Sequence, residues 1–227
     1  MDKFIIEGGN RLCGAVQTQS AKNSVLVLLA ASILTEEQVT IENVPHISDV
    51  LHMSEILQKL GADVCFADGN VTISSGNAAE RDLSSHLTRE LRSSVFMLGS
   101  VLTRFKHARI SYPGGCDIGL RPIDLHLFGL KKLGVKTEER DGYIVCNAEK
   151  LVGANIHLDF PSVGATENII LASVKAQGET VITNAAKEPE IRDLQDFLNQ
   201  MGAGVRGAGT DTIVVRGVQR LHGTRFT

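Results

Sequence analysis

The sequence predicts one α/β domain with internal three-fold pseudo-symmetry over residues 22 to about 225. One observation is a glycine that follows an apolar residue three times, at Gly61, Gly134 and Gly202, spaced 73 and then 68 residues apart. The other is the order of elements, because each copy shows a helix, a short strand, a second helix and a hairpin. One such unit cannot bury its apolar faces alone, so we expect three units to pack around a shared helical core.

Each unit opens with a helix that carries apolar residues at helical spacing. These first helices are expected to begin near Ala21, Leu91 and Ala165. They align without a gap when the isoleucines of the following strands are superposed. Those isoleucines are Ile41, Ile110 and Ile182.

The second helix of each unit ends at the recurring glycine, because glycine adopts the left-handed conformation of a helix end at no steric cost. Its apolar residues recur at helical spacing, as at Met53, Ile56, Leu57 and Leu60 in the first unit. A hairpin follows, with Asp-Gly turns at 68–69 and 141–142 in the first two units. The units cover about residues 22–75, 88–148 and 162–217.

The composition excludes several classes of protein. The 227 residues are 43% hydrophobic and 22% charged, which is typical of a globular protein. The net charge of −3 argues against nucleic-acid binding. The longest apolar run, from Val25 to Leu34, is far shorter than the roughly 20 residues of a membrane span. Glu7 interrupts any signal-peptide core. We therefore expect a cytoplasmic protein that binds neither nucleic acid nor membrane.

One cysteine differs from the other three in its surroundings. The cysteines at 13, 65, 116 and 146 lack zinc-ligand spacing, and no spacing implies a metal or an organic cofactor. Cys116 lies in a loop that is longer than its equivalents, because 12 residues separate the strand isoleucine from the second helix where the other units have 8. This glycine-rich loop, 113–122, is either a plain surface loop or a segment that closes on a ligand. Arg121 and the following helix N-terminus would both stabilise a Cys116 thiolate, which favours the functional interpretation.

The starts of the three first helices form a second candidate site. Equivalent positions carry Lys22-Asn23, Arg92 and Ser162-Val163-Gly164. Helix N-termini present unpaired N–H groups and partial positive charge, which suit phosphates. If pseudo-symmetry brings the three together, they form an anion site for a ligand with several phosphates. The alternative is that Lys22 and Arg92 are solvated charges at helix ends.

His126 stands where the other units place the core residues Met53 and Leu194. A buried histidine with a hydrogen-bond partner is the more common explanation. The second possibility is that His126 and Asp124 face a ligand across the loop.

These segments resemble the motifs of the enolpyruvyl transferases, in particular of the branch that acts on UDP-N-acetylglucosamine. The resemblance extends over all 227 residues, with Thr18-Gln19-Ser20 in place of a more usual Ser-Gly. Its most specific segments are Ala21-Lys22-Asn23, Pro113-Gly114-Gly115-Cys116, Arg121-Pro122-Ile123-Asp124-Leu125-His126, Ser162-Val163-Gly164-Ala165-Thr166 and Glu188-Pro189-Glu190-Ile191.

The resemblance implies a fold and a reaction. The fold is an inverse α/β barrel-like domain made of three pseudo-symmetric βαβαββ repeats. The reaction moves the enolpyruvyl group of phosphoenolpyruvate to the 3-hydroxyl of UDP-N-acetylglucosamine and releases phosphate, the first committed step of peptidoglycan synthesis. No cofactor is implied. In this resemblance Cys116 is the catalytic acid and the target of fosfomycin.

The resemblance also assigns binding residues. Phosphoenolpyruvate is expected to bind Lys22, Asn23 and Arg121. UDP-N-acetylglucosamine is expected to bind Arg92, Arg121, Pro122, Ile123, Asp124, Leu125, Ser162, Val163 and Gly164.

Family chains are considerably longer than this one. By resemblance, residues 1–21 are opening strands of a second, C-terminal domain that is missing here, and residues 22–227 are the three-repeat domain. We therefore expect the chain to be inactive alone. The alternatives are a non-catalytic half-enzyme that binds the UDP-sugar, and a shikimate-phosphate enolpyruvyl transferase, which the Cys116 loop disfavours.

Overall fold

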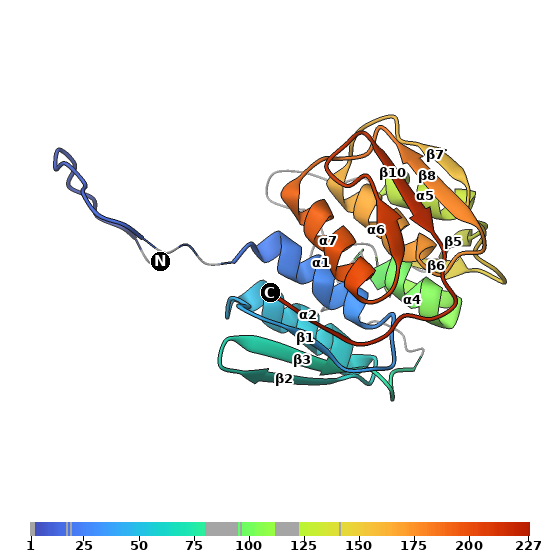
Figure 1. Cartoon of the computed structure of the whole chain (residues 1–227), viewed down its shortest axis with the longest axis horizontal. Coiled ribbons are helices and arrows are strands. Elements are labelled where there is room, and N and C mark those ends of the chain that lie inside the picture. The colour runs from blue at the N-terminus through green and yellow to red at the C-terminus, as the bar shows by residue number, and fades with distance from the viewer. Residues whose placement is uncertain are drawn as a thin grey trace.

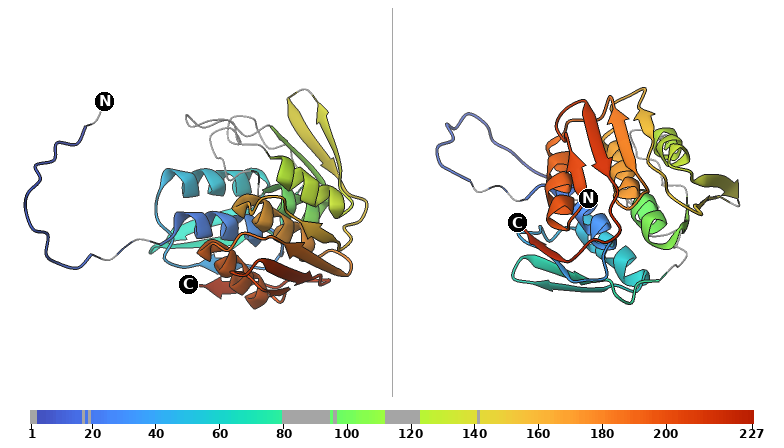
Figure 2. Two further views of the ribbon diagram at one scale, coloured as in Figure 1. Left: turned by 90° about the horizontal axis from the view of Figure 1, so that it is seen from above. Right: turned by 45° about the vertical axis from the view of Figure 1, so that its right-hand side comes forward.

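The computed structural model describes residues 3–16, 18, 20–79, 95, 97–111, 123–140 and 142–227. The helices gather in the middle of the molecule and the sheets lie around them on the outside (Figure 1). Figure 2 shows this arrangement from two further sides. The core therefore lies among the helices and between the helices and the inner faces of the sheets.

The predicted α/β fold of three similar units is confirmed. The first unit contains α1 (Lys22–Ser32), β1 (Val39–Ile41), α2 (Ser48–Lys59), β2 (Asp63–Ala67) and β3 (Asn70–Ser74). The second contains α4 (Met97–Phe105), β4 (His107–Ser111), α5 (Asp124–Lys132), β5 (Lys136–Arg140) and β6 (Tyr143–Asn147). The third contains β7 (Asn155–His157), α6 (Val163–Ser173), β8 (Glu179–Thr183), α7 (Pro189–Gln200), β9 (Gly204–Arg206) and β10 (Thr212–Arg216), and β11 (Thr224–Phe226) follows it.

The recurring glycines end the second helices as predicted. The φ angles of Gly61, Gly134 and Gly202 are 93°, 94° and 94°. These values lie in the left-handed region, where an L-residue with a Cβ atom is strained. The same backbone reversal therefore starts the hairpin of every unit.

The start of one first helix differs from the prediction. Helix α6 begins at Val163, two residues before Ala165, because the Ser162 hydroxyl accepts a hydrogen bond from the Ala165 amide over 3.3 Å and caps the helix. Helix α1 begins at Lys22, next to the expected Ala21. The expected start at Leu91 lies outside the described residues.

The strands of the described residues form three separate sheets. Their orders are β11-β1-β3-β2, β4-β6-β5 and β7-β8-β10-β9. In the third unit the parallel neighbour of β8 is β7, which directly precedes that unit's helices. In the first unit the parallel neighbour of β1 is β11, from the end of the chain. Residues 224–226 therefore complete the sheet of the first unit.

The helices divide into two kinds. Helices α1 and α6 are buried along almost their whole length, and α4 is buried from Met97 to Thr103. The second helices α2 and α7 bury one face only. Within the described ranges, no helix is both long and apolar enough to cross a bilayer.

Neighbouring helices of the described residues are in contact at corresponding ends, which indicates that they run in a similar direction. Hydrogen bonds connect their C-terminal ends, and Arg104 at the end of α4 is central because it donates to carbonyl groups just beyond α1. Contacts between side chains of the first turns connect the opposite ends, as described below. The hydrogen bonds at the C-terminal ends are Arg104 to Ile33 and Thr35, Ala79 to Leu60, Val152 to Leu133, Gly153 to Gln177, His222 to Met201 and Thr35 to Leu221.

One buried asparagine joins the second and third units. The Asn168 Oδ1 atom of α6 accepts a hydrogen bond from the Gly99 amide of α4 over 2.7 Å. Its Nδ2 atom lies 3.2 Å from His126 Nδ1 of α5. A Cβ atom on Gly99 would lie 2.5 Å from both oxygen atoms of Asn168, so only glycine fits between these helices. The second turn of α6 is thereby joined to the N-terminal parts of α4 and α5.

Residues 3–16 extend away from the rest of the protein (Figures 1 and 2). Within this described segment the chain forms no strand. The side chains of Phe4, Ile5, Ile6, Leu12 and Val16 are 83–96% exposed. That these residues pair with a sheet of another domain remains a prediction.

We expect Gly99→Ala to destabilise the fold by about 2 kcal/mol or more, because the added methyl group must displace the Asn168 backbone. Gly76→Ala is the matched control, since its Cβ atom would meet only an ordinary contact at 3.5 Å. Urea unfolding followed by circular dichroism measures both. Equal midpoints for the two variants would contradict the tight contact between α4 and α6.

Candidate functional site

The first turn of α1 contacts the first turns of two other helices. Lys22 Nζ lies 2.6 Å from Asp49 Oδ2 of α2. Asn23 Nδ2 donates a hydrogen bond to Glu190 Oε1 of α7 over 3.3 Å. The Ser24 hydroxyl donates to Asp193 of the same helix. These contacts gather the N-terminal ends of α1, α2 and α7, and the link through Asn168 holds the N-terminal parts of α4, α5 and α6 together.

The charges at this end follow a pattern that repeats in every unit. The second helices α2, α5 and α7 each carry an acidic residue in the first turn, namely Asp49, Asp124 and Glu190. The first helices α1 and α6 carry none, and most of the residues that lead into α4 lie outside the described ranges. Carboxylates neutralise the positive end of a helix dipole. The N-terminal ends of the first helices therefore keep the positive potential that attracts an anion.

Lys22 adds a full positive charge to this end. A cation at a helix N-terminus is unfavourable, and the ion pair with Asp49 offsets that cost. The side chains of Lys22 and Asp49 are 49% and 32% exposed, so solvent weakens their attraction. The Lys22 ammonium group is therefore accessible to an anion that replaces Asp49.

The first turn of α6 offers a second group of backbone amides. Ser162 is the N-cap, and its hydroxyl accepts from the Ala165 amide. Val163 and Gly164 form the first turn and are half-buried. Phe160, two residues earlier, is 66% exposed although it is large and apolar. The surface at this helix end thus combines amide donors with an exposed aromatic ring.

The start of α5 lies beside this helix. Ile123 is buried, Asp124 is exposed and Leu125 is half-buried. His126 is buried and contacts Asn168 of α6. Burial lowers the pKa of His126 to about 4, so the ring is neutral at physiological pH. The structure thus supports the first explanation of His126, a core histidine with a hydrogen-bond partner.

Four predicted site residues lie outside the described residues, namely Arg92, Cys116, Arg121 and Pro122. The other three cysteines are described. Cys13 and Cys65 are exposed, and Cys146 is buried. Burial raises the pKa of the Cys146 thiol to about 12, so this cysteine is unreactive at neutral pH.

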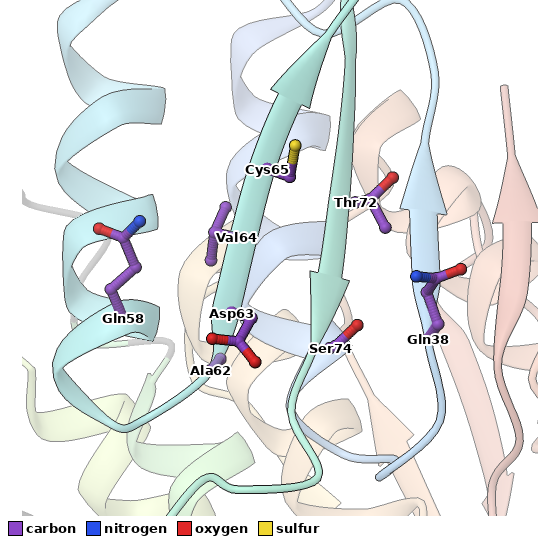
Figure 3. A pocket seen from close by; sticks show the side chains of 8 residues that line it. All are labelled: Gln38, Gln58, Ala62, Asp63, Val64, Cys65, Thr72 and Ser74. Atoms are coloured by element: carbon purple, nitrogen blue, oxygen red, sulfur yellow. The ribbon is translucent and has the colours of Figure 1, made fainter.

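Two cavities among the described residues lie in different places relative to these helix ends. A cavity of about 430 Å³ is lined by Asp63, Cys65, Thr72 and neighbouring residues of the first sheet (Figure 3). It also contacts Gln58 in the last turn of α2, whereas Asp49 lies in the first turn, so this cavity is remote from the gathered helix ends. A smaller cavity of about 190 Å³ includes Ser24 and Asp193 and borders the start of α1.

Several residues at this end were assigned no functional role from the sequence, although Glu190 lies in a segment that carries the family resemblance. Asp49, Glu190 and Asp193 are partners of α1, and Phe160 is exposed beside α6. The sequence signal for Asp49 and Glu190 was their position in the first turn of a helix. Glu167 of α6 was also missed, because a charged residue inside an apolar helix pattern usually faces solvent, whereas Glu167 is buried. Among the described residues, no group of three histidine, cysteine, aspartate or glutamate side chains is arranged to hold a metal ion.

Comparison with protein families and curated proteins finds close similarity. The model of the family "EPSP synthase (3-phosphoshikimate 1-carboxyvinyltransferase)" matches residues 6–227. UDP-N-acetylglucosamine 1-carboxyvinyltransferase 2 of Caldanaerobacter subterraneus subsp. tengcongensis is 54% identical over 227 residues, which are 100% of this chain and 54% of that protein. UDP-N-acetylglucosamine 1-carboxyvinyltransferase 1 of Clostridium acetobutylicum is 50% identical over 229 residues, 100% of this chain and 55% of that protein. The chain thus spans about half the length of the curated relatives it matches.

Solved structures share the fold. The enolpyruvyl transferase NikO from Streptomyces tendae superposes with a TM-score of 0.84 at 27% identity, over 97% of this chain and 52% of that chain. An EPSP synthase from Acinetobacter baumannii superposes with a TM-score of 0.74 at 20% identity, over 93% of this chain and 48% of that chain.

The buried His126 predicts a loss of stability in acid. Unfolded histidine takes up a proton near its ordinary pKa of 6.5, whereas folded His126 stays neutral down to about 4. Stability that is complete above pH 6.5 should therefore decrease as the pH falls toward 4, by about 3 kcal/mol in total from this group.

Urea unfolding of the protein and of His126→Gln between pH 4 and 8 measures this effect. We expect the free energy of unfolding to decrease less steeply with falling pH in His126→Gln than in the unchanged protein. In His222→Asn, which alters an exposed histidine, it should decrease as steeply as in the unchanged protein. A His126 ring that titrates near 6.5 by NMR would contradict the prediction, whether or not the variant folds well.

Proposed function

The chain belongs to the EPSP synthase family, and we propose that it forms one domain of an enolpyruvyl transferase that acts on UDP-N-acetylglucosamine. The reaction transfers the enolpyruvyl group of phosphoenolpyruvate to the sugar 3-hydroxyl and releases phosphate. This is the first committed step of peptidoglycan synthesis, which takes place in the cytoplasm. The names of curated relatives at 54% and 50% identity support this choice of substrate.

The pattern of acidic residues at the helix starts carries the proposal. Carboxylates cover the N-terminal ends of α2, α5 and α7, whereas those of α1 and α6 have none. The uncovered ends are the ones for which the sequence predicts phosphate binding. Both proposed substrates are phosphate esters, so a surface with several helix N-termini and a lysine suits them.

We assign phosphoenolpyruvate to Lys22, Asn23 and Arg121. Lys22 is half-exposed and paired only with Asp49 among the described residues, so its charge can turn to a phosphate or carboxylate. The Asn23 amide group, held by Glu190, would position the carbon that becomes tetrahedral. These charges would stabilise the redistribution of charge during addition.

Cys116 is the proposed acid. The methylene carbon of the alkene gains a proton as the sugar oxygen attacks the neighbouring carbon, and it loses a proton as phosphate leaves. A thiol can perform this transfer if its pKa is drawn toward the working pH. The assignment rests on the sequence resemblance of the loop 113–122.

We assign the UDP-sugar to two described segments and to Arg92, Arg121 and Pro122. At the start of α5, Asp124 is exposed to a ligand, while Ile123 and Leu125 shape the apolar surface. At the start of α6, the backbone amides of Val163 and Gly164 are the proposed phosphate donors, and the Ser162 hydroxyl lies beside them, because the Ser162 amide already donates to the Phe160 carbonyl. Exposed Phe160 lies beside them and is a candidate for contact with the uracil ring.

A second domain would complete this site. The curated relatives are about twice as long, and residues 3–16 expose apolar side chains that need a partner. We propose that residues 1–21 join a sheet of that domain, that residues 22–227 are the three-repeat domain, and that the chain alone is inactive. A half-enzyme that binds the UDP-sugar without turnover is the second candidate, because the first turns of α1 and α6 are ordered by their own contacts.

We expect Cys116 to be the first cysteine alkylated by iodoacetamide at pH 7, because Lys22 and Arg121 would stabilise its thiolate. Peptide mapping by mass spectrometry identifies the labelled residue. Cys13 and Cys65 are internal controls, since they are exposed, and Cys146 should react last because it is buried. In the complete enzyme, fosfomycin should label the same cysteine. Faster labelling of Cys13 or Cys65 would sink the assignment.

We expect the 227-residue chain to bind UDP-N-acetylglucosamine weakly and to release no phosphate from phosphoenolpyruvate. Calorimetric titration measures binding, and a phosphate-release assay measures turnover. Steady phosphate release by the purified chain would refute the proposal that the chain alone is inactive. No heat of binding at millimolar ligand would refute binding by the first turns of α1 and α6.

A further inference from the structure

The first sheet has an edge that no other strand of the described residues covers. Strand β2 stands at the end of the order β11-β1-β3-β2 and pairs with β3 only, and it is the lowest strand in Figure 1. The cavity in Figure 3 borders Asp63, Val64 and Cys65 of this strand, so open space lies beside it. An open edge presents unpaired N–H and C=O groups to which another strand can bind. The edge of β2 is therefore a candidate interaction surface.

The other two units protect the equivalent edge strand. The recurring glycines align β2 with β5 of the second unit and β9 of the third. Four of the five residues of β5 are charged, and β9 has only three residues, the last of them Arg206. Charged side chains and short length are two common ways to prevent an edge strand from pairing. Strand β2 has neither, because its five residues carry one charge, Asp63 at the start, and include the exposed Phe66.

The turn that joins β2 to β3 determines which backbone groups face the open edge. The two residues of this turn, Asp68 and Gly69, have positive φ angles of 50° and 75°. Such a turn closes with a hydrogen-bonded pair, here Ala67 and Asn70, and every second pair along the ladder is then hydrogen-bonded. The N–H and C=O groups of residues 64 and 66 therefore point away from β3.

These outward groups match a second copy of the same strand. In an antiparallel pair with its two-fold axis at Cys65, Val64 of each copy lies opposite Phe66 of the other. Each of these two pairs exchanges two hydrogen bonds, so the four outward groups of each strand are all satisfied. Val64 is half-buried and Phe66 is exposed, so each apolar side chain would cover the other. On the opposite face Cys65 meets Cys65 and Asp63 meets Ala67, so no like charges oppose each other.

We propose that β2 is an interaction surface for a second copy of this chain, and that antiparallel pairing of β2 about Cys65 joins two four-stranded sheets into one. Both copies use the same edge, so the assembly closes at two chains. Because five residues on each side bury less than the roughly 1,000 Å² of a stable interface, the dimer is weak. The proposal is independent of the proposed function, since the cavity beside β2 is remote from the gathered helix ends.

The first experiment measures the mass of the 227-residue chain by sedimentation equilibrium under reducing conditions, from micromolar to millimolar concentration. Cys65→Lys and Cys65→Glu each place like charges on the two-fold axis and should each weaken dimerisation about fivefold or more. An equimolar mixture of the two variants should dimerise again, because Lys then lies opposite Glu. Cys65 is exposed, so both variants should fold.

The matched control is Glu138→Lys, which changes the equivalent, exposed position of β5 and should dimerise like the unchanged protein. A mixture that dimerises no better than its two components would overturn the two-fold pairing at Cys65. An unchanged protein that stays monomeric at millimolar concentration would overturn the proposal outright.

The second experiment traps the pair with diamide, which takes two electrons and two protons from two thiols to form a disulfide. The proposed pairing places two Cys65 Cα atoms about 4.5 Å apart, within disulfide range. Peptide mapping should find a Cys65–Cys65 disulfide before any disulfide of Cys13, which is also exposed. Phe66→Glu, which gives β2 the acid that β5 has at Glu139, should slow this trapping. A Cys13–Cys65 disulfide would instead show that residues 3–16 of another copy occupy the edge, and would overturn the proposal.

Discussion

The similar direction of neighbouring described helices is the electrostatic constraint on which the rest of the structure depends. Dipoles aligned side by side leave positive potential at one end of the domain and negative potential at the other. At the negative end, Arg104 donates to the carbonyl groups of Ile33, Thr35 and Ser75. At the positive end, first-turn carboxylates lie on the second helix of each unit, namely α2, α5 and α7. Arg104 therefore neutralises part of the negative potential at the C-terminal ends. Part of the positive potential at the N-terminal ends stays available to an anion.

The three-fold repeat separates two tasks. The second helices use an apolar stripe for packing and an acidic first turn for their own stability. The first helices α1 and α6 are buried along almost their whole length beyond the first turn, and the small residue Ser162 caps α6. Glu167 places an ionisable group inside this inner layer, and a buried acid costs stability.

The repeated sequence pattern made the fold predictable. The contacts between side chains of the site could not be predicted from the sequence. The helix ends at Gly61, Gly134 and Gly202 depend on a glycine and an apolar stripe within one short segment, so the sequence was sufficient. Asn23 and Glu190 are 167 residues apart, and only the packing of α1 against α7 joins them. The start of α6 was misplaced because its cap, Ser162, lies outside the apolar stripe. The function of loop 113–122 remains a prediction, since all of its residues lie outside the described ranges.

The pairing of β11 with β1 affects how the domain folds while the ribosome synthesises the chain. Thr224 to Phe226 align with Val39 to Ile41, so the first sheet acquires its outer strand only after the other two units have been synthesised. Until then β1 keeps an open edge that can pair wrongly with another chain. Contacts between segments so far apart in sequence also slow folding, because a long loop must close before they form. The first unit to leave the ribosome is thus the last to be completed, and the three similar units are tied into one cooperative whole.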